Sequence, residues 1–559
     1  MMKRLICLCV ALMLTMGAAL AEADIWPASE EKLSVTIAIV PQNSGEYDLE
    51  NMWVTNYWNE VTNLDITWQV IDPAVAAEKV VLMMAGGEMP DAFMGYYDFN
   101  NAMISQYGVE EGLLYDFNKL LDYMPGFSAL LEEKPHVRAA VTTPDGAIYG
   151  LPNMADGDYS HALRYFINAE WLEKTGLAMP TTLDEMYDVL CAFRDGDMNG
   201  NGDTTDEIPF SGSWSEGYSE RAWFLNAYGF STDKSNTALY YNENGEASPA
   251  YIPYTEQYKE YLTYMNKLWN ENLLDRDLFT QTDAQVSTKF TEGKIGYLNC
   301  AAPGAVHPPF EFVYDAAHVL KAGEEKAFVY PSIAAVAHPG MFVLNADCDE
   351  KTAIALAKFA DSFFNIKTFG LYAKGPSYSE EAHEADPELG QMWNTEYGRY
   401  VDPENGNIVI KKIDDKYSSD WIWASTFQSF WTQPGYVCGG NLEWEIEFAK
   451  MYPETTLGQY YAQFDYEPQY NNWRTQSIEA HCAYYHEMLP NFFYSADDQL
   501  AVTDYTMVLD DYVSNMEAKF ITGELSIEDN WAEFQSTLEK YGVKEYMDIL
   551  NTYWAGYIA

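Results

Sequence analysis

The N-terminal part of the chain switches repeatedly between strand-like and helix-like apolar patterns. The apolar run LSVTIAIV is long enough for one buried strand, and helical spacing and strand alternation follow it in turn. The predicted order is strand 33–40, helix 51–61, strand 65–70, helix 75–85 and a strand that begins at 91. A second alternation starts at Leu163. Strands and helices that alternate at such short spacing predict a parallel α/β sheet.

Longer amphipathic helices follow in the second half of the sequence. Helical spacing predicts them at residues 256–270, 352–364, 506–520 and 531–541. In the third of these, Leu509, Val513 and Phe520 share one face, and Gly523 marks the end. No internal repeat or low-complexity linker separates the regions, so direct crossings are expected between them.

One helix carries clear signals at both ends. Thr182 and Glu185 have the spacing of a capping box at a helix start. The apolar stripe that follows consists of Met186, Val189, Leu190 and Phe193. The pattern then stops, and the loop from Asp195 to Glu207 places a carboxylate or amide at nearly every second position. Ca²⁺ takes about six to eight oxygen ligands in irregular geometry, so this loop predicts a calcium site.

Two frames of an EF-hand-like loop fit the segment. In one frame Asp195 opens the loop and Gly200 stands at its sixth position. In the other, Asp197 opens the loop, Gly202 stands sixth and Glu207 closes a shorter loop. The second is favoured because Glu207 is the better bidentate ligand. The alternative is a solvated acidic turn, since Asp, Asn and Gly are turn residues. A bound cation is expected to stabilise the fold and not to take part in catalysis or calcium sensing.

The chain opens with the features of a secretory signal peptide. Lys3 and Arg4 precede an apolar run, and Ala19, Leu20 and Ala21 form a small-x-small cleavage site. We expect residues 1–21 to be removed near Ala21. The cysteines in the apolar run lack the small residues that precede a lipid-acceptor cysteine, so no lipobox is recognised. The mature protein is therefore expected outside the cytoplasm, at the cell surface or in a periplasm.

Charge and motifs narrow the function classes. The chain has 85 acidic and 32 basic residues and a net charge of −53, which excludes nucleic acid as a partner, because its phosphates would be repelled. No HExxH, phosphate loop or GxSxG motif is present, and close carboxylate pairs are expected by chance in so acidic a chain. We therefore expect a binding protein and not an enzyme.

Nine segments, taken in order, are characteristic of one family. They are LMMAGGEMPDAF (82–93), GLLYDFNKLL (112–121), DGAIYGLP (145–152), YFINAEWLEKTGLAMPTTLDE (165–185), the oxygen-rich loop, YLTYMNKLWNENLLD (261–275), FTEGKIGY (290–297), GMFVLNADCD (340–349) and KFITGELSI (519–527). The series resembles the extracellular solute-binding proteins of family 1, which deliver ligands to ABC importers. Within that family it is most similar to the aldouronate-, alginate-oligosaccharide- and LipO-type proteins.

The resemblance implies a fold and a domain division. The fold is the α/β, two-lobed, type II periplasmic-binding-protein (Venus flytrap) architecture, with mixed sheets flanked by helices. Lobe 1 would contain residues 24–154 and 338–375, and lobe 2 residues 155–332 and 376–559, with chain crossings near 152–159, 331–337 and 373–381.

The resemblance also implies a cofactor and partners. The cofactor is a structural Ca²⁺ held by Asp197, Asn199, Asn201, Asp203, Asp206 and Glu207. Because the loop is one residue longer than in the subgroup, Asp203 could contribute its backbone oxygen instead. The partners are a sugar or oligosaccharide and the ABC transporter permease subunits, with the protein itself a monomer.

Sugar recognition uses aromatic faces, amides and carboxylates on loops at strand ends. The candidates are Asn43, Trp53, Tyr96, Asn153, Tyr159, Trp214, Asn299 and Trp423. At least two of Trp53, Trp214 and Trp423 are expected to contact ligand. The favoured hypothesis is a binding protein that closes around an oligosaccharide and presents it to a permease. The alternative is a secreted, calcium-dependent carbohydrate-active enzyme or adhesin of similar shape.

Overall fold

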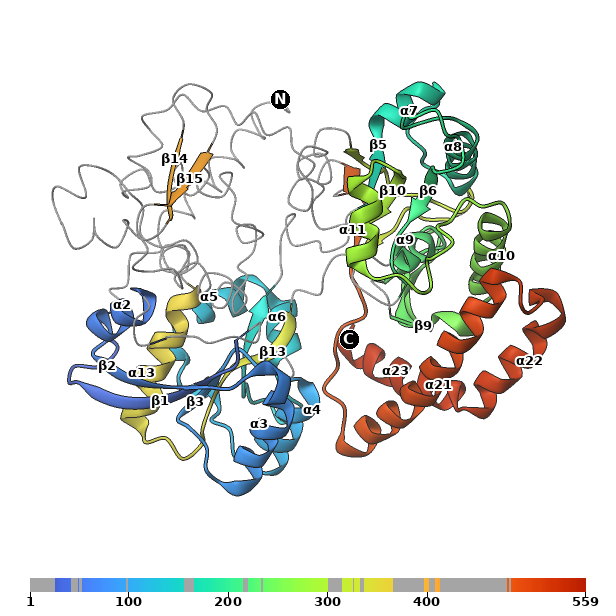
Figure 1. The fold of residues 1–559 in the computed structure, drawn as a ribbon. Helices are drawn as coiled ribbons and strands as arrows, with labels where there is room; N and C mark the ends of the chain where they lie inside the picture. The colour runs from blue at the N-terminus through green and yellow to red at the C-terminus, as the bar shows by residue number, and fades with distance from the viewer. Residues whose placement is uncertain are drawn as a thin grey trace, which may run out of the picture. The chain divides into compact units, whose positions relative to one another are not determined.

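The computed structural model of the 559-residue chain describes the residues of two compact units. The described ranges are 26–41, 49, 53–96, 99–154, 165–214, 220–232, 235–299, 314–324, 326–331, 336–364, 397–401, 408–412, 480–481 and 484–558. Among them, the first unit holds those up to Met154 and from His338 to residue 412. The second unit holds those from Tyr165 to residue 337 and from residue 480 onward (Figure 1).

A five-stranded mixed sheet forms the centre of the first unit. Its order is β2 (Leu64–Val70), β1 (Leu33–Ile39), β3 (Ala92–Met94), β13 (Val336–Leu344) and β4 (Leu151–Met154). Strand β1 is parallel to β2 and β3, whereas β13 is antiparallel to β3. A separate antiparallel pair joins β14 (Tyr397–Val401) and β15 (Ile408–Lys412).

Helices cover this first sheet. They are α2 (Trp53–Val61), α3 (Ala76–Gly86), α4 (Asn101–Ile104), α5 (Pro125–Glu133), α6 (Pro135–Val141) and α13 (Glu350–Asp361). The fully buried Trp58 of α2 lies edge-on to Phe359 of α13, with ring centroids 5.2 Å apart. At the end of α13, the carboxylate of Asp361 accepts hydrogen bonds from the backbone N–H groups of Gly126 (3.0 Å) and Phe127 (2.7 Å). These contacts fasten α13 to the first turn of α5.

The second unit contains a four-stranded mixed sheet and two smaller sheets. The four strands, in order, are β11 (Tyr314–Ala316), β5 (Tyr165–Asn168), β10 (Ile295–Asn299) and β6 (Ile208–Ser211). Strands β6 and β10 are parallel, and β5 is antiparallel to β10 and β11. The smaller sheets are β7 (Phe230–Ser231), β8 (Thr237–Tyr241) and β9 (Ala247–Tyr251), and the pair β12 (Tyr330–Pro331) and β16 (Tyr485–His486).

The helices of the second unit come from two distant parts of the sequence. The first group is α7 (Ala169–Thr175), α8 (Leu183–Asp195), α9 (Arg221–Asn226), α10 (Glu256–Asn270) and α11 (Asp283–Thr291). The C-terminal group is α21 (Ala496–Thr522), α22 (Ile527–Lys540) and α23 (Val543–Tyr557), drawn in orange and red in Figure 1. Both groups share one core, in which Phe520 and Phe534 pack with Tyr258 and Leu262 of α10.

Short helical turns connect these elements. The 3₁₀ turns are Pro73–Val75, Phe117–Lys119, Leu121–Tyr123, Ile252–Tyr254 and Ser362–Phe364, and a short π-helix spans Ser105–Glu110. No helix within the described ranges is long and apolar enough to cross a membrane.

Helix α8 has the start and the buried face that its sequence predicts. The Thr182 side chain accepts from the Glu185 N–H, and the Glu185 carboxylate accepts from the Thr182 N–H, which completes the capping box. The whole apolar stripe of this helix is buried. Phe193 packs against β10 so closely that a Cβ built on Gly296 would lie 2.5 Å from the Phe193 ring. This strand position therefore has room only for glycine.

Two predictions about elements need correction. The sheets are mixed and not parallel, because β13 and β5 run against their neighbours, and apolar spacing carries no information on strand direction. The helix predicted at 506–520 starts ten residues earlier, where Ser495 caps it and two acidic residues fill its first turn. The N-terminal part of this helix is exposed and has no apolar stripe that would reveal it. The sequence analysis also does not predict α23. The lobe limits stay a prediction, since the third crossing and the signal peptide lie outside the described residues.

Candidate functional site

Half of the predicted ligand residues cannot be placed. Asn43, Tyr159 and Trp423 lie outside the described residues, and Trp53 opens α2 with a side chain that is not described. In the first unit, Tyr96 follows β3 and is buried, edge-on to Phe99 at 6.3 Å. Asn153 lies within β4 and is also buried. These residues remain predicted ligand contacts.

In the second unit, two predicted residues follow the carboxyl ends of parallel strands. Asn299 ends β10, and Trp214 lies three residues beyond the end of β6. Ligands of α/β proteins bind outside the carboxyl ends of the strands. Because β5 is antiparallel to β10, Tyr165 at its start pairs in register with Asn299. We call this end of the sheet the strand-end edge.

Aromatic residues that the sequence analysis did not select also gather there. The indole of Trp223, in α9, stacks on the Tyr165 ring with centroids 4.1 Å apart. His481 lies edge-on to Trp223 at 6.1 Å, and its Nε2 is 2.7 Å from the carbonyl oxygen of Ala317. No local signal in the sequence could have identified this group, because its members lie up to 316 residues apart.

The position of Trp214 depends on the segment that follows α10. Its backbone N–H donates to the Leu278 carbonyl at 3.1 Å, and its ring lies 4.8 Å from that of Phe279. Phe279 in turn lies 5.5 Å from Trp269, over which the Arg276 guanidinium is centred at 4.6 Å. Trp214 and Phe279 are half-buried, so part of each ring is accessible to a partner.

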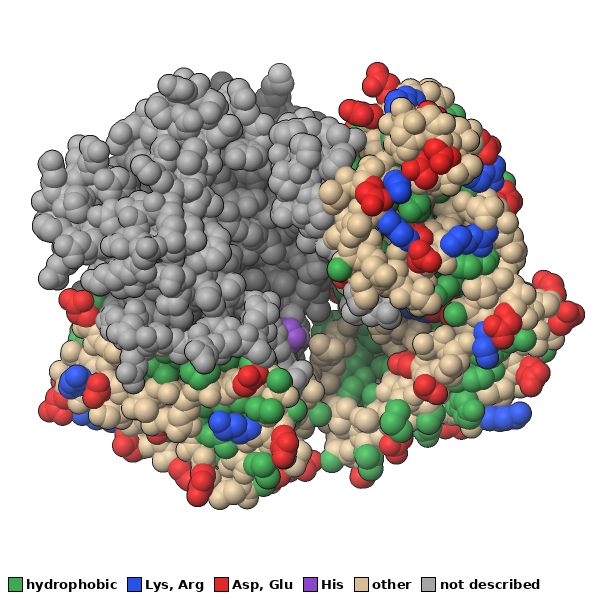
Figure 2. Space-filling model, viewed as in Figure 1, with side chains coloured by type: hydrophobic (Ala, Val, Ile, Leu, Met, Phe, Trp, Pro, Cys, Tyr) green, Lys and Arg blue, Asp and Glu red, His purple; other side chains and the backbone are tan. Residues whose placement is uncertain are grey.

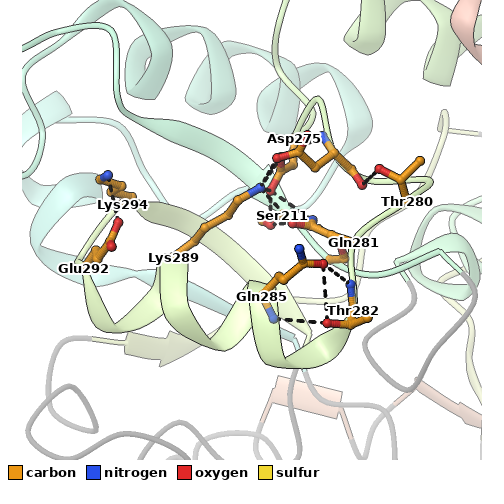
Figure 3. Close-up of polar contacts among 11 residues, drawn as sticks. Ser211, Asp275, Thr280, Gln281, Thr282, Gln285, Lys289, Glu292 and Lys294 are labelled. Carbon is orange, nitrogen blue, oxygen red and sulfur yellow. Dashed lines mark hydrogen bonds and ion pairs between the residues drawn. The ribbon is translucent and has the colours of Figure 1, made fainter.

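Four polar side chains, which we call the Asp275 cluster, hold this segment against β6 (Figure 3). Lys289 Nζ lies 2.9 Å from both carboxylate oxygens of Asp275 and 2.7 Å from Gln281 Oε1. Ser211 at the end of β6 donates to Asp275 at 2.6 Å, and Gln281 donates to it at 3.0 Å. Burial acts to raise the pKa of Asp275, but the hydrogen bonds from Lys289 and Ser211 outweigh it and lower that pKa.

At the other end of β6, the oxygen-rich loop is folded by its own hydrogen bonds. The Gly202 N–H donates to Asp197 Oδ2 at 2.9 Å. This bond fits the second loop frame, in which Asp197 is the first residue and Gly202 the sixth. The Met198 N–H donates to Glu207 Oε1 at 2.9 Å, which brings the end of the loop to its beginning. Met198 itself is buried in the core. The loop thus joins the end of α8 to the start of β6.

The donor set of this loop fits a hard cation. Asp197 Oδ1 and Glu207 Oε2 are buried and have no hydrogen-bond partner among the described residues. Two inward carboxylate oxygens without partners are costly unless a cation meets them. The other oxygens are engaged within the loop, since Asp206 accepts from the amides of Asn199 (3.1 Å) and Asn201 (2.9 Å). With these oxygens engaged in hydrogen bonds, the described ranges contain no point at which three or more Asp, Glu, His or Cys side chains come together.

Asp203 is hydrogen-bonded to a neighbouring residue of the loop and is exposed. Its Oδ1 accepts from the Thr205 N–H at 2.9 Å, and the side chain is exposed. A hydrogen bond from the Thr205 hydroxyl lowers the pKa of Asp203. Acidic side chains are spread over the whole visible surface of both units in Figure 2, so the acidity of this loop alone does not distinguish it.

Comparison with known proteins identifies the family. A family model described as bacterial extracellular solute-binding protein matches residues 53–368, which is more than half of the chain. The fructooligosaccharide ABC transporter substrate-binding protein FusA of Streptococcus pneumoniae serotype 4 is 26% identical over 493 residues, covering 86% of this chain and 83% of FusA.

Solved structures share the fold along nearly the whole chain. FusA in complex with kestose has a TM-score of 0.66 at 22% identity and covers 94% of this chain and 99% of its own. Another structure is that of a FusA EF-hand mutant. A human milk oligosaccharide (HMO)-binding solute-binding protein of Bifidobacterium longum infantis has a TM-score of 0.71 at 22% identity and covers 94% of this chain and 98% of its own.

The similar structures confirm the two-lobed α/β fold with mixed sheets that the resemblance implied. The family match covers the strand-end edge of the second unit and the oxygen-rich loop, and it confirms the resemblance seen in the nine segments. This chain therefore belongs to the bacterial extracellular solute-binding proteins.

Proposed function

We propose that the protein captures an oligosaccharide outside the cytoplasm and hands it to the permease subunits of an ABC importer. The observation that carries the proposal is the family match, supported by similarity to FusA over most of both chains. The strand-end edge supplies suitable chemistry, with the half-buried ring of Trp214 and the amide of Asn299 beside Tyr165. Aromatic faces and amides are the groups that bind sugar rings and hydroxyls.

Titration calorimetry with defined ligands tests this function. The panel is kestose, a neutral milk oligosaccharide, an alginate oligosaccharide and a peptide of similar mass. We expect a sugar to bind with a Kd of about 1 μM or lower and to be recovered intact by chromatography. Binding of the peptide alone would contradict the sugar proposal. Shortened sugar products would instead support the secreted-enzyme alternative.

We also infer that the oxygen-rich loop holds a structural Ca²⁺. Asp197 and Glu207 would contribute the two buried oxygens that lack partners. Asn199, Asn201, Asp203 and Asp206 are the remaining proposed ligands. The cation would supply positive charge to these carboxylates and fix the end of α8 against the start of β6. The FusA EF-hand mutant supports the inference at the level of a relative.

Calcium need not be tightly bound to fill such a site outside a cell. Extracellular sites with Kd of about 10⁻⁴–10⁻³ M suffice where calcium is near millimolar. The loop precedes β6, and the strand-end edge lies at the other end of that strand. If the bound calcium is structural, it should raise the melting temperature whether or not sugar is present. The permease, the monomeric state and the signal-peptide cleavage near Ala21 remain parts of this proposal.

A further inference from the structure

Glu220 is a fully buried acid whose carboxylate has no hydrogen-bond partner among the described residues. It directly precedes α9, after the chain leaves the carboxyl end of β6. Its side chain has no exposed surface, and neither carboxylate oxygen has a hydrogen-bond partner in the described part of the chain. Buried polar groups in folded proteins are almost always hydrogen-bonded, so each exception calls for an explanation.

The other buried acids of the described ranges show how unusual this is. Asp275 has Lys289 and Ser211, Asp361 has two backbone N–H groups, and Glu517 has Arg221. Glu207 has one partnered and one free oxygen, as expected for a cation ligand. Glu220 alone in this set leaves both oxygens free, and no cluster of acidic, His or Cys side chains that could share a cation with it occurs in the described ranges.

The surroundings of Glu220 disfavour the charged form of its carboxyl group and raise its pKa. Burial raises the pKa of Glu220 well above the usual range; its own backbone N–H acts in the opposite direction, and the nearby negative charge of Asp275 adds a smaller increase. A neutral carboxyl group has one O–H donor and free acceptor positions. It can therefore donate a hydrogen bond to a hydroxyl group and also accept one from it.

Helix α9 brings this carboxyl to the strand-end edge. Trp223 is one helical turn after Glu220, and residues three apart lie on the same face of a helix. The Trp223 ring stacks on Tyr165, which pairs with Asn299. The backbone next to Glu220 is fixed as well, because the side chain of Arg221 is held by Glu517 at 2.9 Å and by Asn236 at 2.6 Å.

We propose that Glu220 is a ligand-recognition residue whose carboxyl group exchanges hydrogen bonds with hydroxyls of a bound neutral sugar. The inference rests on the proposed sugar-binding function and adds a specific residue and bond type to it. An unpartnered buried carboxyl lowers the stability of the ligand-free protein. Proteins retain such local costs mainly at functional sites. The sugar hydroxyls would provide the partners that the chain does not.

Two substitutions test the proposal through stability and affinity together. Glu220→Met replaces the carboxyl with an apolar side chain of similar length. We expect the ligand-free melting temperature to rise by about 2 °C, because the cost of the unpartnered group is removed. The affinity for the sugar that binds wild type best in the calorimetric panel should fall about tenfold. Glu220→Gln keeps a donor and an acceptor, so its affinity should lie between those of Glu220→Met and wild type.

The matched control is Glu517→Gln, at an acid of similar burial that has a partner, and its melting temperature should fall. A lower ligand-free melting temperature for Glu220→Met would show that the carboxyl has a structural partner and would overturn the inference. Unchanged sugar affinity in Glu220→Met would also overturn it, while leaving the sugar-binding function intact. If wild type binds none of the sugars, the proposed function itself fails, and this inference fails with it.

Discussion

The guanidinium Nε of Arg221 lies 2.9 Å from Oε1 and 3.0 Å from Oε2 of Glu517, and both side chains are buried. The two residues are 296 positions apart in the sequence. Arg221 also donates to Asn236 at 2.6 Å, and Asn236 donates to Asp510 at 2.7 Å. Since Asp510 and Glu517 both belong to α21, this helix is fastened at two points to elements beside the strand-end edge.

Neutralising this ion pair should destabilise the protein strongly. Glu517→Gln leaves the Arg221 charge buried without its counter-ion, which costs about 3–5 kcal/mol in the free energy of unfolding. Urea denaturation followed by tryptophan fluorescence measures the change. Glu528→Gln is the control, because Glu528 pairs with Lys259 at 3.2 Å on the surface and should change stability by no more than about 0.5 kcal/mol. Equal effects of the two substitutions would contradict the expected importance of burial.

Asp361 should make stability depend on pH. Burial raises its pKa to about 6, against the hydrogen bonds from Phe127 and Gly126 that lower it. A raised carboxyl pKa means that the folded state binds the proton more tightly than the unfolded state. This contribution is therefore full below the ordinary pKa of 3.8 and is lost as pH rises through about 6. From pH 4 to pH 7, wild type should lose about 2.4 kcal/mol relative to Asp361→Asn.

Denaturation curves at several pH values between 4 and 7 measure this difference. Asp349→Asn, at the other end of the same helix, is the control. The Thr352 N–H lowers the pKa of Asp349, so its contribution is lost only as pH falls through that lowered value. Its stability difference from wild type should stay nearly constant over this range. A constant difference for Asp361→Asn would rule out the raised pKa.

Calcium should stabilise the second unit through Asp197 and Glu207. At free calcium ten times Kd, a site that exists only in the folded state adds about 1.4 kcal/mol, and chelation with EGTA removes it. Glu207→Gln and Asp197→Asn should abolish the calcium-dependent shift in melting temperature. Asp195→Asn distinguishes the two loop frames. Asp195 pairs with Arg194 on the surface, so the shift should persist in that variant. Its loss would favour the frame that Asp195 opens.

Two glycines should respond to alanine in opposite directions. Gly296→Ala places a methyl group 2.5 Å from the Phe193 ring and 2.9 Å from the Pro209 carbonyl oxygen. This overpacking should cost about 1–3 kcal/mol. Gly556 lies in α23 with no atom within 4 Å of an added Cβ, so Gly556→Ala should stabilise the protein by about 0.5–1 kcal/mol. Calorimetric melting temperatures give both signs, and a rise for Gly296→Ala would refute the close contact.

Local features of the sequence were predictable because neighbouring residues determine them. Thr182 and Glu185 form the capping box that their spacing indicates, and Met186 and Phe193 are buried on the expected face. The fold followed from motif order. Contacts between distant segments were not predictable in this way. The residues next to Trp223 in the sequence do not indicate that it stacks on Tyr165. Those next to Glu220 do not indicate that its carboxylate has no hydrogen-bond partner among the described residues.

Whether two strands pair parallel or antiparallel could not be predicted from their apolar patterns. The chain enters β13 after passing through the second unit, and residues 336–344 have no pattern that distinguishes parallel from antiparallel pairing with β3. Of the predicted ligand residues, Asn299 ends β10 and Trp214 lies three residues beyond the end of β6, so both are near the carboxyl ends of parallel strands. Their contact with a sugar remains a prediction.

Because early and late segments of the chain share the core of the second unit, the order of synthesis limits when this unit can fold. Residues 165–324 leave the ribosome long before α21, α22 and α23, and the segment that completes the first sheet is made between them. Until the last helices emerge, the apolar faces of α10 and its neighbours have nothing to cover them, and Arg221 has no counter-ion. Incomplete cores of this kind aggregate readily. We therefore expect this unit to complete its fold only after the last helices have been synthesised.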